Sequence, residues 1–571
     1  MRWVSRGNLS LVLAAFALVA APFVVELTRH RPLAIGKPAG LSMLLGLLLA
    51  AAAWLRVTSY RPRPAVVVSA AVVAALALSA ASWRCVAPVT PDSCNYMAGA
   101  SAILHGRPYL NIKDELQLTF PPGYPALVAA ALAVVGDEEL GSRLVSALAS
   151  AATIPVLYLL LLRLAGPSTS AAACLLVALV PLRVHLSTMV WSESAYLLFL
   201  LLGLLAMCQW LERGGYWRAA LTGAALGGAY LIRPEAALVL GIAVACAYGY
   251  RRGALRRSAQ PILLVGAFAV VALPYVLFMH NHTGRWQLTG KSSTNLATAE
   301  ARSQNLPVHG LYRLDEDTGR VEIARQPALP TLPGRAIRNA YGIMARLPAL
   351  VSPLLFAFAG LGLGLMWVRQ RGSPAAAAVL LTLASPLLFL PVFFWEDRML
   401  LAPVVLGVAL GMIGVAGVAD ILAGDGRKRL KWWLVIGAAG LLVGQAAQDG
   451  VIARPARERE YVKIAHWIEE HFPRRSVMVS RLAVVSYYAD KTHRPLPWAP
   501  LDGVVRYARD QHAELMLLPR RGHEPSIVRY ASEPHDSQDL ELVKLWDDLA
   551  LFRLRPPPAT SEGARPPPDG R

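Results

Sequence analysis

Long apolar runs separated by short polar segments fill the first 450 residues of this 571-residue chain. Most runs have about 17–25 residues, the length that an α-helix needs to cross a bilayer. The candidate spans are Leu9–Leu27, Ala39–Leu55, Ala65–Trp83, Arg143–Leu162, Ser168–Ser187, Ser192–Leu211, Arg218–Ile232, Ala236–Tyr250, Pro261–Met279, Leu347–Val368, Ala375–Phe394, Met399–Ile421 and Trp432–Gln448. The pattern therefore predicts a polytopic α-helical membrane protein with about 13 transmembrane helices.

One further apolar run, Pro121–Gly136, has two interpretations. As a crossing helix it would place Arg163 on the outer side, whereas as an interfacial helix it keeps the basic loops on one side. Those loops contain Arg163, Arg251–Arg257, Arg369–Arg371 and Arg427–Lys431. The positive-inside rule favours the interfacial interpretation, which puts the loops at 85–142 and 280–346 on the outer side.

The apolar pattern stops near residue 450. Helical spacing at Glu460–Phe472 and Val504–Gln511 then alternates with strand-like runs at Ser476–Ser480 and Glu514–Leu518, and Leu540–Leu554 is typical of a hairpin. We expect two N-terminal spans at 1–64, a transmembrane catalytic module at 65–449, a small extracytoplasmic α/β domain at 450–555 and a disordered tail at 556–571.

The composition supports a membrane location. Hydrophobic residues make up 55% of the chain and charged residues 16%, and the mean hydropathy is +0.44. The net charge of +19 does not indicate nucleic-acid binding, because the arginines cluster in short loops between spans. We expect an integral protein of a bacterial inner membrane, with its active site and its C-terminal domain extracytoplasmic.

Two acidic residues at span ends are the first candidates for chemistry. Asp92 follows the span Ala65–Trp83, and Glu193 lies at the turn before Ser194. A helix cap is the alternative for Asp92, and a first-turn acid favoured by the helix dipole is the alternative for Glu193. Two carboxylates on one membrane face suit a general base with an assisting acid, or a divalent metal.

Two arginines lie on the same predicted side, against the positive-inside bias. Arg398 opens a span directly after Asp397, and Arg233 precedes Pro234. Pairing with Glu396 or Asp397, and with Glu235, would explain them locally. Recognition of a lipid phosphate is the sharper hypothesis, because arginine binds phosphate through two N–H groups.

The outer loops offer weaker candidates. Tyr109 and Lys113 in the first loop could line a sugar site, although most neighbouring polar residues fit a solvated loop. The second loop contains His280, His282 and Lys291, and two histidines one residue apart are weak grounds for a metal. Cys85 and Cys94 flank Asp92 and are either free thiols or a disulfide in an extracytoplasmic loop.

The segments that contain these residues resemble the GT-C superfamily of polytopic glycosyltransferases. Within it, the chain is most similar to the group of protein mannosyltransferases, the aminoarabinose transferase of lipid A and the RgtA–D-like lipopolysaccharide transferases. The matching segments are Pro91–Tyr96, His105–Tyr109, Phe120–Pro125, Arg143, Ser192–Glu193, Leu231–Glu235 and Asp397–Leu400 with Pro403.

The resemblance implies a polyprenyl-phosphate sugar donor and a lipid, glycan or protein acceptor at the outer membrane face. Asp92 would be the base that deprotonates the acceptor, and Glu193 would assist or help to hold Mg²⁺ or Mn²⁺. Arg398, with Arg233, would hold the donor phosphate. Many relatives have a second acid beside the first-loop Asp, whereas Pro91 and Ser93 stand there in this chain, which puts metal dependence in doubt.

Three other functions remain open. A lipid or sugar transporter would place ionisable residues near the bilayer midplane, whereas the charges here are at span ends. An oligosaccharide ligase or polymerase would use the loop at 280–346. A non-catalytic scaffold would leave the acids and arginines without a role. Glycosyl transfer in cell-envelope synthesis, to lipopolysaccharide or to protein, is the prediction.

Overall fold

The computed structural model describes residues 63–83, 89–250, 259–291, 312–314, 321–323, 332–370, 373–422, 427–448 and 458–556. The predicted spans Leu9–Leu27 and Ala39–Leu55 lie outside these ranges, as does Cys85. The chain forms two compact units. The first comprises residues 1–111, 116–295 and 328–459, and the second comprises residues 112–115, 296–327 and 460–571.

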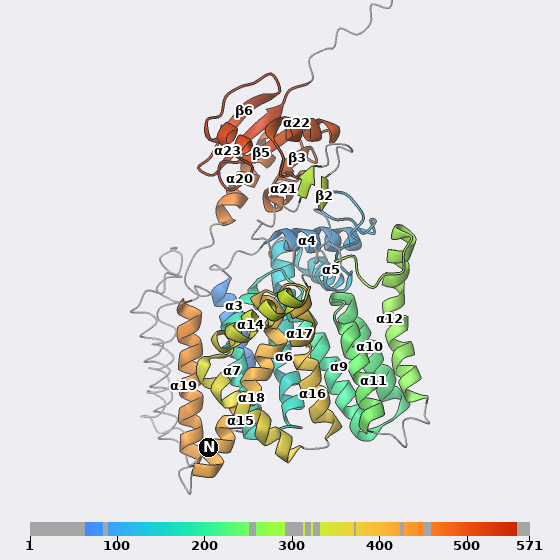
Figure 1. Ribbon diagram of the computed structural model, residues 1–571, viewed down its shortest axis with the longest axis vertical. Helices are drawn as coiled ribbons and strands as arrows, with labels where there is room; N and C mark the ends of the chain where they lie inside the picture. The colour runs from blue at the N-terminus through green and yellow to red at the C-terminus, as the bar shows by residue number, and fades with distance from the viewer. Residues whose placement is uncertain are drawn as a thin grey trace, which may run out of the picture. The chain divides into compact units, whose positions relative to one another are not determined.

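The first unit is built of helices (Figure 1). In chain order they are α3 (Pro64–Ser82), α4 (Pro91–Leu104), α5 (Gly123–Val135), α6 (Glu138–Leu161), α7 (Pro167–Ala178), α8 (Pro181–Thr188), α9 (Glu193–Arg213), α10 (Tyr216–Ile232), α11 (Ala236–Tyr250), α12 (Gln260–Thr283), α14 (Leu332–Val351), α15 (Pro353–Arg369), α16 (Pro374–Ala384), α17 (Pro386–Phe389), η3 (Leu390–Val392), η4 (Asp397–Leu400), α18 (Leu401–Leu422) and α19 (Arg427–Gln448). Among the described residues, five helices are long and apolar enough to cross a membrane, or eight if each bent pair counts as one span.

Three predicted spans are bent pairs and not single helices. The run Ser168–Ser187 forms α7 and α8 with a 57° bend, and Ala375–Phe394 forms α16 and then α17 with η3, bent by 45°. The run Leu347–Val368 is divided between α14 and α15, which meet at 108°. The second helix of each pair begins with a proline, namely Pro181, Pro386 and Pro353. Proline disfavours helical geometry in the residue before it, and Val180 and Ser352 are indeed not helical. Ser385 before Pro386 stays helical, and the bend there is the smallest of the three.

The run at Pro121–Gly136 forms α5, which has 13 residues and is too short to cross a bilayer. It ends at Gly136, whose φ of 75° lies in the left-handed region that glycine adopts without strain. Helix α5 packs against α4 and α6. The short length favours the interfacial interpretation over a crossing helix, within the loop predicted at 85–142.

The helix α18 lies in the core of the bundle and packs closely on α15. A Cβ at Gly362 would lie 1.9 Å from the Leu410 carbonyl oxygen, and one at Gly414 would lie 2.1 Å from that of Phe358. Small residues let the two backbones touch, as is common where helices associate within membranes. This contact holds the middle of α18 against α15.

The second unit contains a five-stranded sheet in the order β4-β3-β5-β7-β6. Its strands are β3 (Val477–Ser480), β4 (Thr492–Pro495), β5 (Leu515–Pro519), β6 (Leu540–Leu545) and β7 (Leu549–Leu554), and a separate hairpin joins β1 (Tyr312–Leu314) and β2 (Val321–Ile323). Its helices are α20 (Glu458–His471), α21 (Ala483–Tyr488), α22 (Leu501–Asp510) and α23 (Pro525–Ser532). β3 is parallel to β4 and β5, whereas β7 is antiparallel to β5 and β6.

A short segment of the first predicted loop, residues 112–115, completes the second unit. The His493 N–H donates to the Ile112 carbonyl at 3.2 Å, and the Thr492 hydroxyl donates to Asp114 at 2.7 Å. The loop segment therefore covers the edge strand β4. Strand β4 was not predicted, because four residues of mixed polarity carry little strand signal without their neighbours.

Candidate functional site

Asp92 lies in the first turn of α4, but it does not cap this helix. The Thr90 hydroxyl accepts a hydrogen bond from the Ser93 N–H at 3.3 Å, and the Ser93 hydroxyl accepts one from the Thr90 N–H at 3.0 Å. This reciprocal cap satisfies the helix start, so Thr90 has the role that the alternative interpretation gave to Asp92. The Asp92 carboxylate is left for contacts outside its own helix.

Arg398 joins three acidic side chains from distant parts of the chain. Its Nη1 donates to Asp92 Oδ2 at 3.1 Å, and its Nε donates to Glu396 Oε2 at 2.7 Å. The same Nε lies 3.8 Å from Glu193 Oε1. The local pairing with Glu396 is therefore present, and it coexists with the contact to Asp92, 306 positions away.

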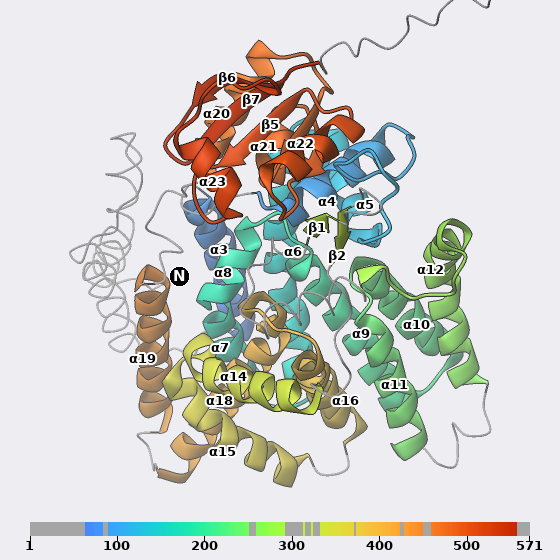
Figure 2. The same ribbon diagram turned by 45° about the horizontal axis from the view of Figure 1, so that its top comes forward.

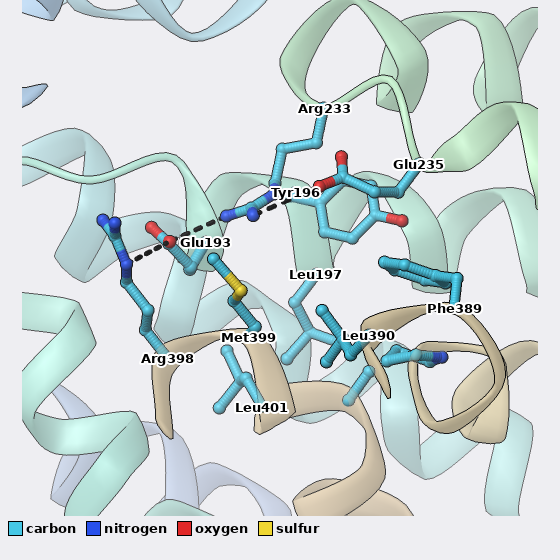
Figure 3. Close-up of a pocket in the computed structure, with 12 residues that line it drawn as sticks. Glu193, Tyr196, Leu197, Arg233, Glu235, Phe389, Leu390, Arg398, Met399 and Leu401 are labelled. Carbon is cyan, nitrogen blue, oxygen red and sulfur yellow. Dashed lines mark hydrogen bonds and ion pairs between the residues drawn. The ribbon is translucent and has the colours of Figure 1, made fainter. Parts of the chain in front are cut away.

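Arg233 binds Glu193 from the other side (Figure 3). Its Nη1 donates to Glu193 Oε1 at 2.7 Å, and its Nη2 donates to Glu235 Oε1 at 3.3 Å. Pro234 favours the extended conformation that Arg233 adopts at the end of α10. The Glu193 side chain is 6% exposed, so one buried carboxylate lies between two guanidinium groups.

Trp191 supports Arg398 and connects it to α4. The Arg398 guanidinium lies 4.5 Å from the centre of the Trp191 ring, within the range of a cation–π contact. The Trp191 Nε1–H donates to the Thr90 hydroxyl at 2.8 Å. Because Thr90 also caps α4, this single hydroxyl ties the tryptophan beneath Arg398 to the helix that carries Asp92.

Lys291 is a further cation near Asp92, and the sequence alone predicted no role for it. Its ammonium lies 4.0 Å from the centre of the Phe120 ring. The preceding residue, Gly290, touches the first loop, because a Cβ there would lie 2.1 Å from the Leu118 carbonyl oxygen. In the sequence, only the pair Gly290-Lys291 after the span Pro261–Met279 hints at this contact, and many loops contain such a pair.

Charges around Asp92 oppose the effect of its burial. Burial alone would raise the pKa of Asp92, but the positive charges of Lys291 and Arg398 hold it below its ordinary value. Burial lowers the pKa of Lys291 below its ordinary value, although Asp92 acts in the opposite direction. Asp92 is therefore ionised at neutral pH and can accept a proton, as a general base must.

A pocket with an empty volume of about 450 Å³, partly open to solvent, lies beside the two arginines. Its polar wall is formed by Glu193, Tyr196, Arg233, Glu235 and Arg398. Its apolar wall is formed by Leu197, Pro386, Phe389, Leu390, Met399, Leu401 and Ala402 (Figure 3). The pocket therefore offers cations to one part of a ligand and hydrocarbon to another.

Three of the predicted site residues have other partners. The Tyr109 hydroxyl donates to the Phe120 carbonyl at 3.0 Å, and Arg346 binds Asp397 at 2.7 Å. Neither Tyr109 nor Asp397 lines the pocket. Lys113 belongs to the second unit, where its carbonyl accepts a hydrogen bond from Arg494 at 2.7 Å.

The contacts of the acidic residues bear on the predicted metal ligands. Within the described ranges, no three side chains of Asp, Glu, His or Cys converge as metal ligands. Asp92 and Glu193, the two predicted ligands, each bind an arginine. The positive charges that act on Asp92 are those of Lys291, Arg398 and Arg233. Cys94 is buried with a free thiol.

Comparisons with known proteins agree with this architecture. The family model of dolichyl-phosphate-mannose-protein mannosyltransferases matches residues 119–278. ArnT from Cupriavidus metallidurans, bound to undecaprenyl phosphate, superposes with a TM-score of 0.58 at 12% identity, over 85% of this chain and 97% of that chain. The oligosaccharyltransferase of Archaeoglobus fulgidus, tethered with an acceptor peptide, superposes with a TM-score of 0.53 at 12% identity, over 79% and 69%. No curated protein matched by sequence.

These likenesses confirm the predicted resemblance to the GT-C superfamily. The family match includes Phe120, Glu193 and Arg233, and the structural match extends over most of the chain. At these identities the solved structures establish the fold. The membrane location is supported by the five described helices that are long and apolar enough to cross a bilayer.

Proposed function

We propose that this chain, which has the GT-C fold, is a membrane glycosyltransferase. It moves a sugar from a polyprenyl-phosphate-linked donor to an acceptor at the extracytoplasmic face. The observation that carries this proposal is the 3.1 Å contact between Asp92 and Arg398 beside a pocket with one charged and one apolar wall. A ligand with an anionic head and a hydrocarbon tail matches such a pocket.

The two arginines would bind the donor phosphate. Arg398 donates hydrogen bonds through Nε and Nη1, and among the described contacts Nη2 donates none. Arg398 and Arg233 both lie next to the Glu193 carboxylate, so the two guanidinium groups point to one region. Two arginines can bind a phosphate through several charge-assisted hydrogen bonds, and Lys291 adds a third positive charge.

The apolar wall would bind the start of the prenyl chain. Phe389, Leu390 and Met399 present hydrocarbon next to the charged groups, within a helical bundle that spans a membrane (Figure 3). Two proteins with the same fold support this ligand class, because ArnT is bound to undecaprenyl phosphate and the A. fulgidus enzyme to dolichol-phosphate. The polyprenyl-phosphate part of the donor is thus the best-supported feature of the proposal.

Asp92 would act as the general base. The acceptor oxygen forms a bond to the anomeric carbon while the bond from that carbon to the phosphate oxygen breaks. Asp92 takes the proton of the acceptor hydroxyl, and the prenyl phosphate leaves with its electron pair and added negative charge. Arg398 and Arg233 stabilise that charge as it develops. The Asp92 side chain is 33% exposed, so an acceptor can reach it.

A transporter fits the charge positions less well. Transporters place ionisable residues near the bilayer midplane, often on broken helices. Here Glu193 begins α9, Arg233 follows α10 and Arg398 precedes α18. The described cluster thus gathers at helix ends, where a lipid headgroup lies, and this arrangement favours transfer at the membrane surface.

Binding of undecaprenyl phosphate tests the proposed donor site. We expect purified protein in lipid nanodiscs to bind this lipid, and Arg398→Gln to weaken binding by about tenfold or more, because a charge-assisted phosphate contact contributes roughly 1.5–3 kcal/mol. The matched control is Arg218→Gln, since Arg218 donates to the Gly214 carbonyl and stacks on Trp217 away from the pocket lining. Equal affinities for the wild type and Arg398→Gln would exclude this donor site.

A further inference from the structure

One face of α14 holds the irregular segment between η3 and η4. The Asn339 amide donates to the carbonyls of Pro391 and Phe393, at 3.0 Å in each case. Three positions further, Gly342 lies against Trp395, where a Cβ would be 2.9 Å from the indole ring. Positions three and four apart share one face of a helix, so both contacts come from the same side of α14.

Arg346 extends that face by one more turn. Its Nη2 donates to Asp397 Oδ2 at 2.7 Å, and its Nε donates to Asp397 Oδ1 at 3.1 Å. This two-pronged geometry fixes the direction of the carboxylate as well as its distance. Asp397 is therefore held by α14, and it directly precedes Arg398.

The held segment needs such support because it has little structure of its own. Residues 393–396 form no helix or strand. Yet Leu390, in η3 just before it, lines the pocket, and Arg398, in η4 just after it, binds Asp92 and Glu396. The contacts from α14 therefore hold the backbone on the N-terminal side of Arg398.

The opposite stripe of α14 is apolar and exposed. Ile337 is 71% exposed, Tyr341 77% and Met344 53%, at a spacing of four and three residues. Helix α14 leads into the apolar helix α15 through a sharp bend of 108° (Figure 2). If α15 crosses the membrane, α14 therefore runs roughly parallel to the membrane surface. A helix with an apolar stripe and basic residues, such as Arg338 and Arg346, is typical of a membrane interface.

We propose that α14 lies in the membrane surface with Ile337, Tyr341 and Met344 in lipid, and that Asn339, Gly342 and Arg346 are positioning residues that hold Arg398 at the pocket. The lipid contact depends on geometry alone. The positioning role rests on the proposed function, because it assigns Arg398 to the donor phosphate. Helix α14 would then contact lipid with one face and hold the segment before Arg398 with the other.

Spin-label accessibility tests the lipid contact without reference to activity. A nitroxide at Ile337→Cys or Met344→Cys is introduced into full-length Cys85→Ser protein in nanodiscs, where the four described cysteines are buried. The references are Val270→Cys on the span α12, which is 74% exposed, and Arg474→Cys, whose side chain is 77% exposed on the second unit. We expect both α14 labels to favour oxygen over a water-soluble nickel chelate, as at Val270. Labels that behave like the one at Arg474 would overturn the lipid contact.

Undecaprenyl phosphate binding tests the positioning role. We expect Asn339→Ala/Arg346→Ala to bind the lipid at least about fivefold more weakly, since small displacements of a positioned group are costly. Arg338→Ala is the matched control, because Arg338 is exposed on the same helix and lies outside the face that holds residues 391–397. Size-exclusion profile and unfolding temperature verify the fold of each variant.

The outcomes separate the two proposals. If the wild type does not bind undecaprenyl phosphate, the proposed donor fails. If the wild type binds and the folded double variant binds equally well, the positioning role fails and the donor site stands. Where the double variant does not fold, Arg346→Lys decides: it keeps the charge but loses the two-pronged contact, so we expect at least about twofold weaker binding. Unchanged binding by Arg346→Lys would then contradict the positioning role.

Discussion

The behaviour of Asp92 depends on the cations that surround it. Lys291 and Arg398 outweigh its burial and hold its pKa below the ordinary value. Thr90 caps α4, so the Asp92 carboxylate is not used as the helix cap and can contact other residues. A single acidic residue thus becomes a candidate base through contacts that reach across the chain, and its role can be tested separately from the stability of its helix.

The lowered pKa of Lys291 predicts how the transfer rate depends on pH in the alkaline range. Burial holds the pKa of Lys291 below its ordinary value of 10.5, so this charge is lost as the pH rises through that lowered pKa. If the charge supports the leaving phosphate, transfer falls in the same pH window. We expect Lys291→Arg to move the fall to higher pH, because arginine stays protonated throughout this range.

Measuring the transfer rate between neutral pH and about pH 10 checks this shift, because that range brackets the ordinary lysine pKa. Lys463→Arg is the control, since Lys463 is exposed on α20 and belongs to the second unit. A profile of Lys291→Arg that coincides with that of the wild type would exclude Lys291 from the reaction.

At the scale of helices, prolines mark where the apolar runs bend and glycines mark where helices pack closely, and hydropathy alone predicts neither. The hydrophobic runs identified the apolar helices, but a run of constant hydropathy does not reveal where it bends. Pro353 and Pro386 begin new helices, and the resulting breaks create the wall of the pocket and the surface helix α14. Prolines inside predicted spans were therefore the available signal for these two features.

The contact between α15 and α18 gives a prediction for stability. Valine at Gly362 would collide with the Leu410 carbonyl, 1.9 Å from the new Cβ, and force the helices apart. We expect Gly362→Val to lower the unfolding temperature in detergent by several degrees, because overpacking of this kind costs about 1–3 kcal/mol. The control is Gly364→Val, because Gly364 lies on the same helix and a Cβ there would have no neighbouring atom within 4 Å.

Equal unfolding temperatures for these two variants would contradict the close helix contact. The comparison removes the effect of helix propensity, since both variants place a β-branched residue in α15. It therefore measures the packing against α18 alone.

At the scale of the whole molecule, the sequence indicated a common side for the main site residues but not their contacts. Asp92, Glu193, Arg233 and Arg398 were all predicted at outer span ends, and the structure joins them in one chain of ion pairs. Lys291 could not be predicted in the same way, because its approach depends on the contact of Gly290 with the first loop. Such contacts between distant segments leave no periodic signal in one sequence.

The second unit includes segments that the sequence pattern did not assign to the C-terminal domain. Residues 112–115 precede most of the bundle in sequence, yet they hydrogen-bond to strand β4 of the second unit. Lys113 was selected for its chemistry as a polar loop residue, whereas the described contact of its backbone is with Arg494. A loop between spans can thus contribute to the fold of a distant domain, and hydropathy does not detect this.

In the proposed reaction, Asp92 removes the proton from a sugar acceptor while Arg398 holds a polyprenyl-phosphate donor. A base of this kind contributes about 10²–10⁴-fold to the rate, so Asp92→Asn would bind the donor but fail to consume it. Asp137→Asn is the control, because Asp137 is an acid whose side chain caps the start of α6 and accepts from the Leu140 N–H at 2.7 Å. It should behave like the wild type.

The most direct measurement is mass spectrometry of the polyprenyl-phosphate-linked sugars that co-purify with wild-type, Asp92→Asn and Asp137→Asn protein. We expect folded Asp92→Asn protein to retain at least about tenfold more lipid-linked sugar than the other two. The mass of the retained sugar distinguishes transfer of a single sugar from ligation of an oligosaccharide. Equal amounts in all three proteins would contradict the role of Asp92 as the base, and no lipid-linked sugar in any of them would contradict the proposed donor.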